Sequence, residues 1–190
     1  DDEETRVRLL RRLANLQERE LDKPKAAIET YRSLHAQVES DRAVVDALVR
    51  LYERTERWPE LLQVLGLQRD FAERPDEINQ IEFREGRLQT NKLDDPASAL
   101  ESFRSILDRN RDHIEARRAV ESLAERADDV AREASDFLQN LYREGEAWTM
   151  LEELLERQLD VVDDPGRRAE LYLELGQLYE ESFDNRQTAF

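Results

Sequence analysis

The sequence LDKPKAAIETYRSL over residues 21–34 returns as LDDPASALESFRSI over residues 93–106, which lies 72 residues later. In both copies a proline stands at the fourth position, and apolar residues then recur at spacings of three and four. That spacing puts one apolar stripe along a helix, so each copy is predicted to be an amphipathic helix. A helix that repeats together with its preceding turn is typical of an array of helical hairpins.

A second repeat has a different period. Trp58, preceded by a Leu-Tyr pair, returns as Trp148, preceded by the same pair, 90 residues later. The two periods differ by 18 residues, which is roughly the length of one helix and its turn. The second half of the chain is therefore predicted to hold one extra helix, which we place at 112–127. Because the two tryptophans stand at equivalent places, packing between repeats is favoured over ligand binding as their role.

The composition excludes several classes of protein. The 190 residues include 45 acidic and 29 basic side chains, which give a net charge of −16, and no cysteine. Such a charge disfavours nucleic acid or an anionic membrane as the main partner, and the lack of cysteine excludes disulfide scaffolds and thiol catalysis. No apolar run approaches the ~20 residues that span a bilayer, and no signal-peptide pattern opens the chain. We therefore expect a cytoplasmic protein with no membrane insertion.

The same three- and four-residue spacing extends over nearly the whole chain, and no window alternates strictly enough to predict a strand. The fold class is therefore all-α. Asp22, Asp94 and Asp164 each precede a proline and are expected to cap the helices that follow. The predicted helices lie near 4–20, 24–38, 41–55, 58–74, 76–91, 96–109, 112–127, 130–143, 147–162 and 167–182, and an eleventh begins near 186.

Small residues recur where neighbouring helices are expected to approach closely. Ala14, Gly86 and Gly176 hold the same place in three equivalent helices. Because glycine inside a helix costs about 1 kcal/mol relative to alanine, its repetition indicates a packing role. A second small set on the partner helices consists of Ala27, Ala99 and Ala189, and the large Tyr31 and Phe103 follow four residues after the first two. This alternation of small and large residues is expected to let one helix of a pair nest on the other.

These residues resemble the tetratricopeptide repeat family. Leu175-Gly176-Gln177-Leu178-Tyr179 is similar to the first-helix signature of that family, and Ala99, Phe103 and Ile106 are similar to its second-helix signature. The resemblance implies a right-handed α-solenoid of antiparallel helix pairs, with divergent repeats and one extra unpaired helix. The expected single domain, 1–190, contains pairs at about 5–40, 41–75, 76–111 and 130–164, the extra helix at 112–127 and an incomplete pair at 167–190. Another α-solenoid with a different pair geometry is the alternative.

The last pair is predicted to be unfinished. A further copy of the first motif starts near Phe183, with Ala189 and Phe190 at its small and apolar positions. Solenoids need a polar element at each end, whereas this end is expected to expose Leu171, Leu175 and Leu178. We therefore expect either a piece of a longer repeat protein or an end covered by another copy.

No pattern of catalytic, metal-binding or cofactor-binding residues occurs. The two histidines, His35 and His113, fall near helix ends and are expected to be solvated. Phosphate-binding glycine loops and nucleophile motifs are absent. Acidic pairs such as Asp94-Asp95 lack the spacing of a calcium loop. We therefore expect a protein that is not an enzyme and that takes no cofactor.

The resemblance further implies that the first helices of successive repeats line a concave groove, which binds a peptide or a helix of a partner protein. On these helices, the residues facing away from the apolar stripe are rich in arginine. The predicted contact set is Arg8, Arg11, Arg12, Asn15, Arg19, Arg50, Arg84 and Arg87. Equivalent positions further on are mostly acidic, namely Glu133, Asp136, Asn140, Glu144, Glu170, Glu174, Gln177 and Glu181.

Two functions follow from this charge pattern. Arginine binds carboxylates through two parallel hydrogen bonds. An acidic peptide or a C-terminal carboxylate therefore suits the first half of the groove. Arg11, Asn15 and Arg84 are similar to part of a carboxylate clamp found in this family. The alternative for these arginines is solvation or pairing with nearby glutamates. The second function is self-association into a structural scaffold, through oppositely charged surfaces and uncapped ends. An RNA-binding helical repeat would need a basic groove throughout.

Overall fold

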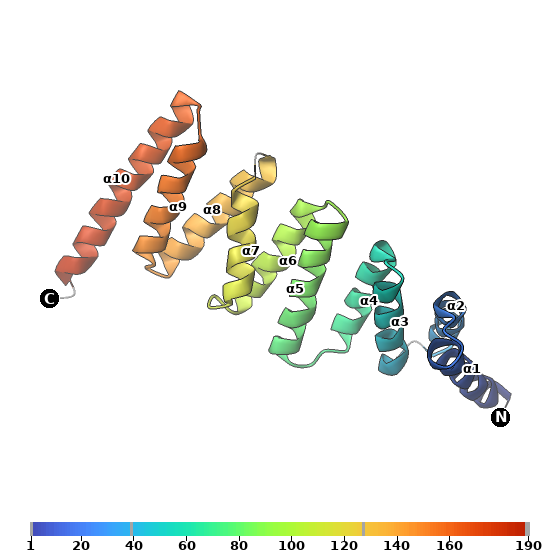
Figure 1. Cartoon of the computed structure of the whole chain (residues 1–190). Helices are drawn as coiled ribbons and strands as arrows, with labels where there is room; N and C mark the ends of the chain where they lie inside the picture. Colours follow the sequence, from blue (N-terminus) through green and yellow to red (C-terminus); the bar gives the residue numbers. More distant parts are fainter. Residues whose placement is uncertain (1, 39, 127, 189–190) are drawn as a thin grey trace. The chain divides into compact units, whose positions relative to one another are not determined.

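The computed structural model describes the backbone of residues 2–38, 40–126 and 128–188, and side chains as far as residue 180 together with that of Ser182 (Figure 1). Every regular element in this part of the chain is an α-helix, as predicted. The helices are α1 (Asp2–Arg19), α2 (Pro24–His35), α3 (Arg42–Arg54), α4 (Trp58–Asp70), α5 (Pro75–Lys92), α6 (Pro96–Arg109), α7 (Ile114–Ala124), α8 (Asp129–Glu144), α9 (Trp148–Val161) and α10 (Pro165–Thr188).

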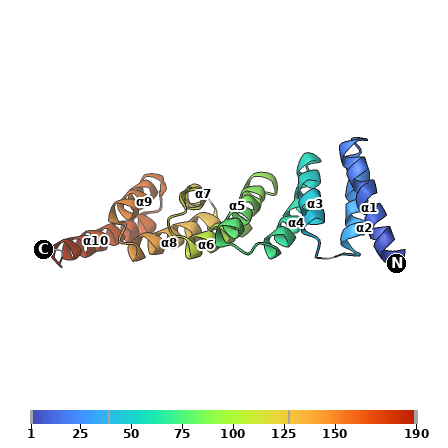
Figure 2. The ribbon, with the colours of Figure 1, turned by 90° about the horizontal axis from the view of Figure 1, so that it is seen from below.

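The chain forms two compact units, Asp1–Asn110 and Arg111–Phe190. Within each unit every helix packs against its neighbours in sequence, which gives an α-solenoid of antiparallel helix pairs (Figures 1 and 2). In the first unit the buried core runs continuously from Ala14 on α1 to Leu88 on α5. None of the described helices has the length and apolar character needed to cross a membrane.

Four hairpins share one turn geometry. Asp22, Glu56, Asp94 and Glu146 have φ angles of 48°, 54°, 52° and 52° and are the left-handed residues, other than glycine, among those described. Each stands in the turn that joins α1 to α2, α3 to α4, α5 to α6 or α8 to α9. Asp22 and Asp94 are separated by the 72-residue period, and Glu56 and Glu146 by the 90-residue period. Both sequence periods therefore describe equivalent hairpins.

Two of the expected helix caps are wrong for the same reason. Asp22 and Asp94 occupy the left-handed turn position, so the cap position falls one residue later. Lys23 then precedes α2 without a side-chain cap, and Asp95 caps α6 by accepting a hydrogen bond from the Ser98 amide at 3.1 Å. The cap predicted at Asp164 is confirmed, because its carboxylate accepts from the Arg167 amide at 2.7 Å.

The extra helix exists as α7, but it is not unpaired. It packs against α8, because Ala116, Val120 and Leu123 form a buried stripe along it. The Tyr142 hydroxyl of α8 also donates to Glu121 Oε1 of α7 at 2.5 Å.

The end of the chain differs from its prediction in two respects. The expected break before an eleventh helix is absent, since α10 continues to Thr188; no glycine or proline follows Gly176 to end it. Leu171, Leu175 and Leu178, expected to be exposed, are buried at 0%, 9% and 1% exposure, because α10 packs on α9. Ala189 and Phe190 lie outside the described residues.

The packing role predicted for Gly86 is confirmed. A Cβ atom placed there would lie 2.5 Å from Cε1 of Phe103, so only glycine lets α5 and α6 approach this closely. At Gly176 no described atom lies within 4 Å of the same built position. The face of α10 that corresponds to the Phe103 site of α5 is therefore uncovered by the described residues.

Candidate functional site

Three of the predicted groove arginines are engaged by carboxylates of neighbouring segments in the first unit. These pairs are Arg50 of α3 with Glu18 of α1 at 3.3 Å, Arg84 of α5 with Glu53 of α3 at 2.8 Å, and Arg11 of α1 with Asp41, which caps α3. The interpretation of arginines paired with nearby carboxylates therefore describes these three side chains. They tie the first helices of successive hairpins to one another.

Asn15 is also engaged within the chain. Its amide nitrogen donates to the Arg11 carbonyl at 2.9 Å, and its side-chain oxygen accepts from the Tyr31 hydroxyl at 3.3 Å. The same hydroxyl lies 3.0 Å from Glu18 Oε2, so its single hydrogen is shared between the two acceptors, of which Glu18 is the nearer. Burial, together with this hydrogen bond, raises the pKa of Tyr31 to about 12. The polar atoms proposed for a carboxylate clamp thus already have partners.

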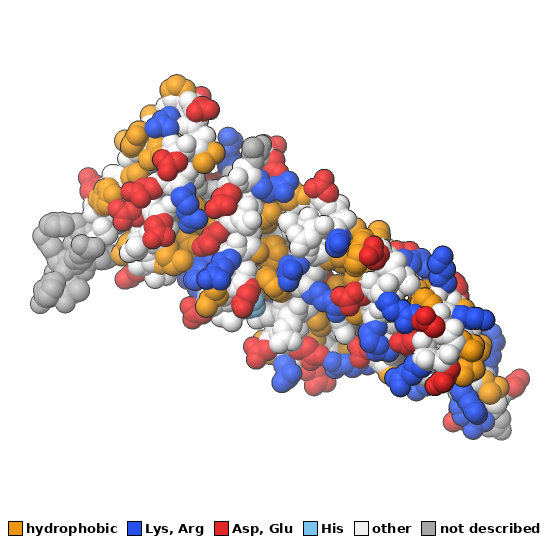
Figure 3. All heavy atoms as spheres, viewed as in Figure 1, with side chains coloured by type: hydrophobic (Ala, Val, Ile, Leu, Met, Phe, Trp, Pro, Cys, Tyr) orange, Lys and Arg blue, Asp and Glu red, His pale blue; other side chains and the backbone are white. Residues whose placement is uncertain are grey.

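The other four predicted arginines are exposed and form no ion pair with any described residue. They are Arg8, Arg12 and Arg19 on α1 and Arg87 on α5. On α1 these arginines repeat at spacings of four and seven and so share one helix face. Figure 3 shows basic side chains gathered over this unit, with acidic ones between them.

The acidic positions predicted for the second unit are likewise partly paired. Glu144 lies 2.5 Å from Arg111, while Glu170 and Glu174 share Arg167 at 3.0 and 3.3 Å. The side chain of Glu181 lies outside the described residues.

The histidines are less solvated than expected. His113 caps α7, where its Nδ1 accepts from the Ala116 amide at 3.2 Å. His35 ends α2, and its Nδ1 is buried without a hydrogen-bond partner among the described atoms. Trp58 packs on the apolar core, with Lys92 Nζ 5.0 Å from its ring centroid. No three His, Cys, Asp or Glu side chains of the described residues gather as a metal site.

A buried polar network in the first unit escaped the sequence analysis. Arg109 of α6 donates to Asn79 at 3.1 Å and to Glu82, and Arg69 of α4 donates to Glu85 at 2.9 Å. Burial raises the pKa of Glu85, and Arg69 opposes that effect. The network could have been predicted from the acidic side chains that share a helical face with the apolar Ile81 and Leu88. The network joins α4, α5 and α6 and has a structural role.

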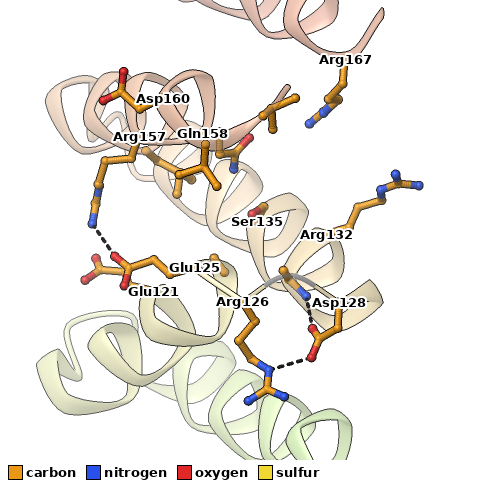
Figure 4. A pocket seen from close by; sticks show the side chains of 15 residues that line it. Glu121, Glu125, Arg126, Asp128, Arg132, Ser135, Arg157, Gln158, Asp160 and Arg167 are labelled. Carbon is orange, nitrogen blue, oxygen red and sulfur yellow. Dashed lines mark hydrogen bonds and ion pairs between the residues drawn. The ribbon is translucent and has the colours of Figure 1, made fainter. Parts of the chain in front are cut away.

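A pocket that the sequence did not predict opens in the second unit (Figure 4). It has a volume of about 580 Å³ and lies between the end of α7, the first half of α8, the end of α9 and the start of α10. Its apolar lining comes from Ala124, Ala131, Leu154, Val161 and Val162.

The frame of the pocket is fixed by side chains at the helix ends. Asp128 accepts from the Ala131 amide at 3.2 Å and from Arg126 at 2.7 Å, and the hydrogen bond from Arg126 lowers the pKa of Asp128. At the far end of α9, Arg168 donates to the carbonyls of Leu159 and Val162 at 2.6 and 3.0 Å. These hydrogen bonds satisfy backbone carbonyls that have no partner within the helix at its C-terminal end.

The polar lining of the pocket divides into two sides. Figure 4 shows Arg157 and Asp160 on one side and Arg132 and Arg167 on the other, with Gln158 between them. Arg157 lies 3.4 Å from Glu125, whereas Arg132 is exposed and has no ion pair with a described residue. Chemically, the second side can donate hydrogen bonds to an acceptor beside an apolar surface.

Comparison with known proteins identifies one repeat directly. Residues 134–169, which cover most of α8, all of α9 and the start of α10, match the family described as tetratricopeptide repeat. The chain therefore contains a tetratricopeptide repeat. The other three hairpins with a left-handed turn residue share the turn geometry of this repeat.

Among solved structures, the chain is similar to BtubC (BKLC) from P. vanneervenii, with 16% identity and a TM-score of 0.35. That match covers 96% of this chain and 76% of BtubC. No curated protein matches the chain significantly.

Proposed function

We propose that the chain is a non-catalytic protein-interaction module that binds an acidic peptide or a helix of a partner protein. The observation that carries the proposal is the tetratricopeptide repeat at 134–169, in an array of hairpins with the same turn. Such repeats typically bind protein partners. The contact surface is the arginine-rich face of α1, α3 and α5.

The exposed arginines carry most of this proposal. Arg8, Arg12, Arg19 and Arg87 have no competing ion pair among the described residues, so a partner carboxylate meets no intramolecular competitor there. Arg11, Arg50 and Arg84 need to exchange an intramolecular carboxylate for one of the partner. Only the Arg84–Glu53 pair is exposed on both sides, so exchanging its carboxylate costs about 0–1 kcal/mol. Glu18 and Asp41 are only 12% and 11% exposed, so the exchange at Arg50 and Arg11 costs more.

The test is affinity capture from a lysate, with identification of the bound proteins. The variant Arg8→Glu with Arg12→Glu is expected to lose the partners that the unaltered chain captures, because both positions reverse charge on one face of α1. Lys25→Glu with Arg118→Glu makes the same change in net charge elsewhere, and both residues are exposed. Capture that is equal for the two double variants overturns the assignment of this face. The double variant Arg8→Glu with Arg12→Glu is a more specific test than Arg11→Glu with Arg84→Glu, because the latter also breaks the ion pairs to Asp41 and Glu53.

A second candidate function is self-assembly as a structural scaffold, and exposed apolar side chains at two helices favour it. On α1, Leu9, Leu13 and Leu16 are 58%, 43% and 45% exposed and follow one stripe. On α10, Tyr172 and Leu173 are 58% and 69% exposed, close in sequence to the open position at Gly176. The leucine stripe of one copy, flanked by arginines, is complementary in charge and in apolar character to the acidic α10 of another. Contacts of this kind join copies head to tail.

Sedimentation velocity at low and high salt tests this second function. Assembly is expected at low salt and is expected to weaken as salt rises, since the Debye length falls from about 10 Å at 0.1 M to about 3 Å at 1 M. Leu13→Asp is expected to abolish assembly, while Ile114→Asp, at an exposed apolar residue on α7, leaves it unchanged. A monomer under all conditions overturns the scaffold and leaves the binding module standing.

A further inference from the structure

The pocket of the second unit contains a hydrogen-bond donor that has no acceptor. The Nε2 atom of Gln158 is buried, and no described atom accepts from it. Nearly all buried polar groups in folded proteins are hydrogen-bonded, so an unpartnered one calls for an explanation. Gln158 lines the pocket, and Figure 4 places its amide between the two sides of the polar lining. An acceptor that enters the pocket would satisfy this donor.

Charged donors stand on one side of that amide. Arg132 has no ion pair with a described residue, and Figure 4 places it on the same side of the pocket as Arg167. Only Nη1 of Arg167 is within reach of Glu170 and Glu174 in the described part of the chain. A guanidinium presents five donors in a planar fork that fits a carboxylate. Two arginines on one side and the amide of Gln158 therefore line the same pocket.

The remaining lining limits the charge and the character of the ligand. Four acidic side chains, Glu121, Glu125, Asp128 and Asp160, line the pocket beside four arginines, so the lining has no net positive charge to hold a group with two or more negative charges, such as a phosphate. A single carboxylate is opposed less strongly. Leu154, which is 4% exposed, and Val161, which is 75% exposed, supply an apolar wall from the inside to the rim. An aliphatic group beside the carboxylate would cover this wall.

We propose that this pocket binds a peptide segment in which aliphatic side chains flank an aspartate or a glutamate. The aliphatic side chain lies against Leu154, Val161 and Val162. The carboxylate accepts hydrogen bonds from Arg132, from Gln158 Nε2 and from the free nitrogens of Arg167. This site belongs to the second unit and uses none of the arginines of α1, α3 and α5. It rests on the proposal that the chain binds proteins, but it fails or succeeds separately from the arginine face.

The test uses three capped peptides and the full chain labelled with ¹⁵N. The probe is acetyl-Ala-Leu-Glu-Leu-Ala-amide. Its first control replaces Glu by Gln, which removes the charge at equal size, and its second replaces both Leu by Ser. Saturable shifts of the Gln158 side-chain amide are expected with the probe, and each control is expected to bind at least about ten-fold more weakly. A hydrogen bond to a charged group contributes about 1.5–3 kcal/mol, and burial of a leucine side chain contributes a similar amount.

Two variants link the shifts to the site. Arg132→Gln is expected to weaken binding of the probe about ten-fold, while Arg118→Gln, at an exposed residue of α7 that does not line this pocket, leaves it unchanged. Gln158→Leu is expected to raise the melting temperature of the free chain and to weaken binding. The rise in melting temperature shows that the fold survives the substitution.

Three outcomes overturn the proposal. The first is an absence of saturable shifts at Gln158, which is also the result if ordered water alone satisfies this amide. The second is equal binding of the Glu and Gln peptides. The third is binding that Arg132→Gln does not alter. Shifts confined to α1, α3 and α5 overturn this site while supporting the arginine face, so failure here is distinguishable from failure of the proposed function.

Discussion

At the scale of single residues, Gly86 and Gly176 show how equal sequence positions acquire different surroundings. Gly86 lies under the ring of Phe103, whereas no described atom lies near the corresponding point at Gly176. The sequence predicted a packing role for both positions, from their place in the repeat. It could not show whether a partner helix covers each, because that depends on residues elsewhere in the chain.

Alanine substitution at the two glycines is expected to have opposite effects. Gly86→Ala forces Phe103 to move and is expected to lower the free energy of unfolding by about 1–3 kcal/mol, the usual cost of overpacking a core. The added methyl group of Gly176→Ala contacts no described atom. This variant is expected to raise the free energy of unfolding by up to about 1 kcal/mol, because alanine has the higher helix propensity. Urea unfolding followed by circular dichroism measures both. Stabilisation by Gly86→Ala would contradict the close contact with Phe103.

Tyr31 is expected to ionise late and to make stability depend on alkaline pH. Its pKa rises from the ordinary 10.0 to about 12 because burial and the hydrogen bond to Glu18 both disfavour the phenolate. The folded state therefore holds this proton more tightly than the unfolded state. Its contribution to stability is fully present below pH 10 and is lost as the pH rises through about 12.

Ultraviolet titration of phenolate absorbance checks the pKa of Tyr31. Tyr31→Phe is expected to remove a transition near pH 12 and to flatten the stability curve between pH 10 and 12. Tyr172→Phe, at an exposed tyrosine of α10, serves as the control and is expected to leave that transition in place. If Tyr31→Phe instead removes a phenolate transition near pH 10, then Glu18 and burial do not raise the pKa of this phenol.

At the scale of the element, the helices were predictable and their ends were only partly so. Apolar spacing located all ten described helices, because each buries one stripe against its neighbours. The turns were harder to predict. Asp22 and Asp94 read as caps from their residue type, but the left-handed backbone at these positions moves the cap onward by one residue. The pocket at the end of α9 was unpredictable, since it depends on how helix ends meet rather than on a periodic pattern.

Asp41 is expected to stabilise α3 in two separable ways. Its carboxylate accepts from the amides of Ala43 and Val44 at 3.1 and 3.3 Å, and it also pairs with Arg11. Asp41→Ala removes both interactions and is expected to cost about 1 kcal/mol or slightly more. Asp41→Ser keeps a capping oxygen and loses only the ion pair, so it is expected to cost less than half as much. Equal costs in urea unfolding would show that the ion pair, not the cap, stabilises this end.

At the scale of the whole molecule, the main packing contacts of each described helix within its unit are with the helices next to it in sequence. Stability in such arrays is a sum of local terms and nearest-neighbour terms. The sequence periods predicted this organisation, because each hairpin copy carries its own apolar stripe. The pairing of α7 with α8 was missed, since α7 has no second copy with which to compare it.

Core substitutions are therefore expected to have local effects. Leu48 of α3 and Leu154 of α9 are 2% and 4% exposed, and each alanine variant is expected to lose about 2–5 kcal/mol of local stability. Amide hydrogen exchange is expected to accelerate most in α2 to α5 for Leu48→Ala and in α8 to α10 for Leu154→Ala. A uniform acceleration over all described helices in either variant would contradict nearest-neighbour coupling.

The left-handed turn residues bear on how such a chain can change its length during evolution. Since one backbone conformation closes all four hairpins, a duplicated hairpin brings with it the turn that joins its two helices. The Gly86–Phe103 contact adds a restriction, because the bulky ring and the residue that makes room for it lie on different helices of one hairpin. Duplication or exchange that copies the hairpin as a whole preserves this fit, whereas recombination inside the turn separates its two halves. Gene rearrangements that leave a folded product are thus expected to have their boundaries between hairpins.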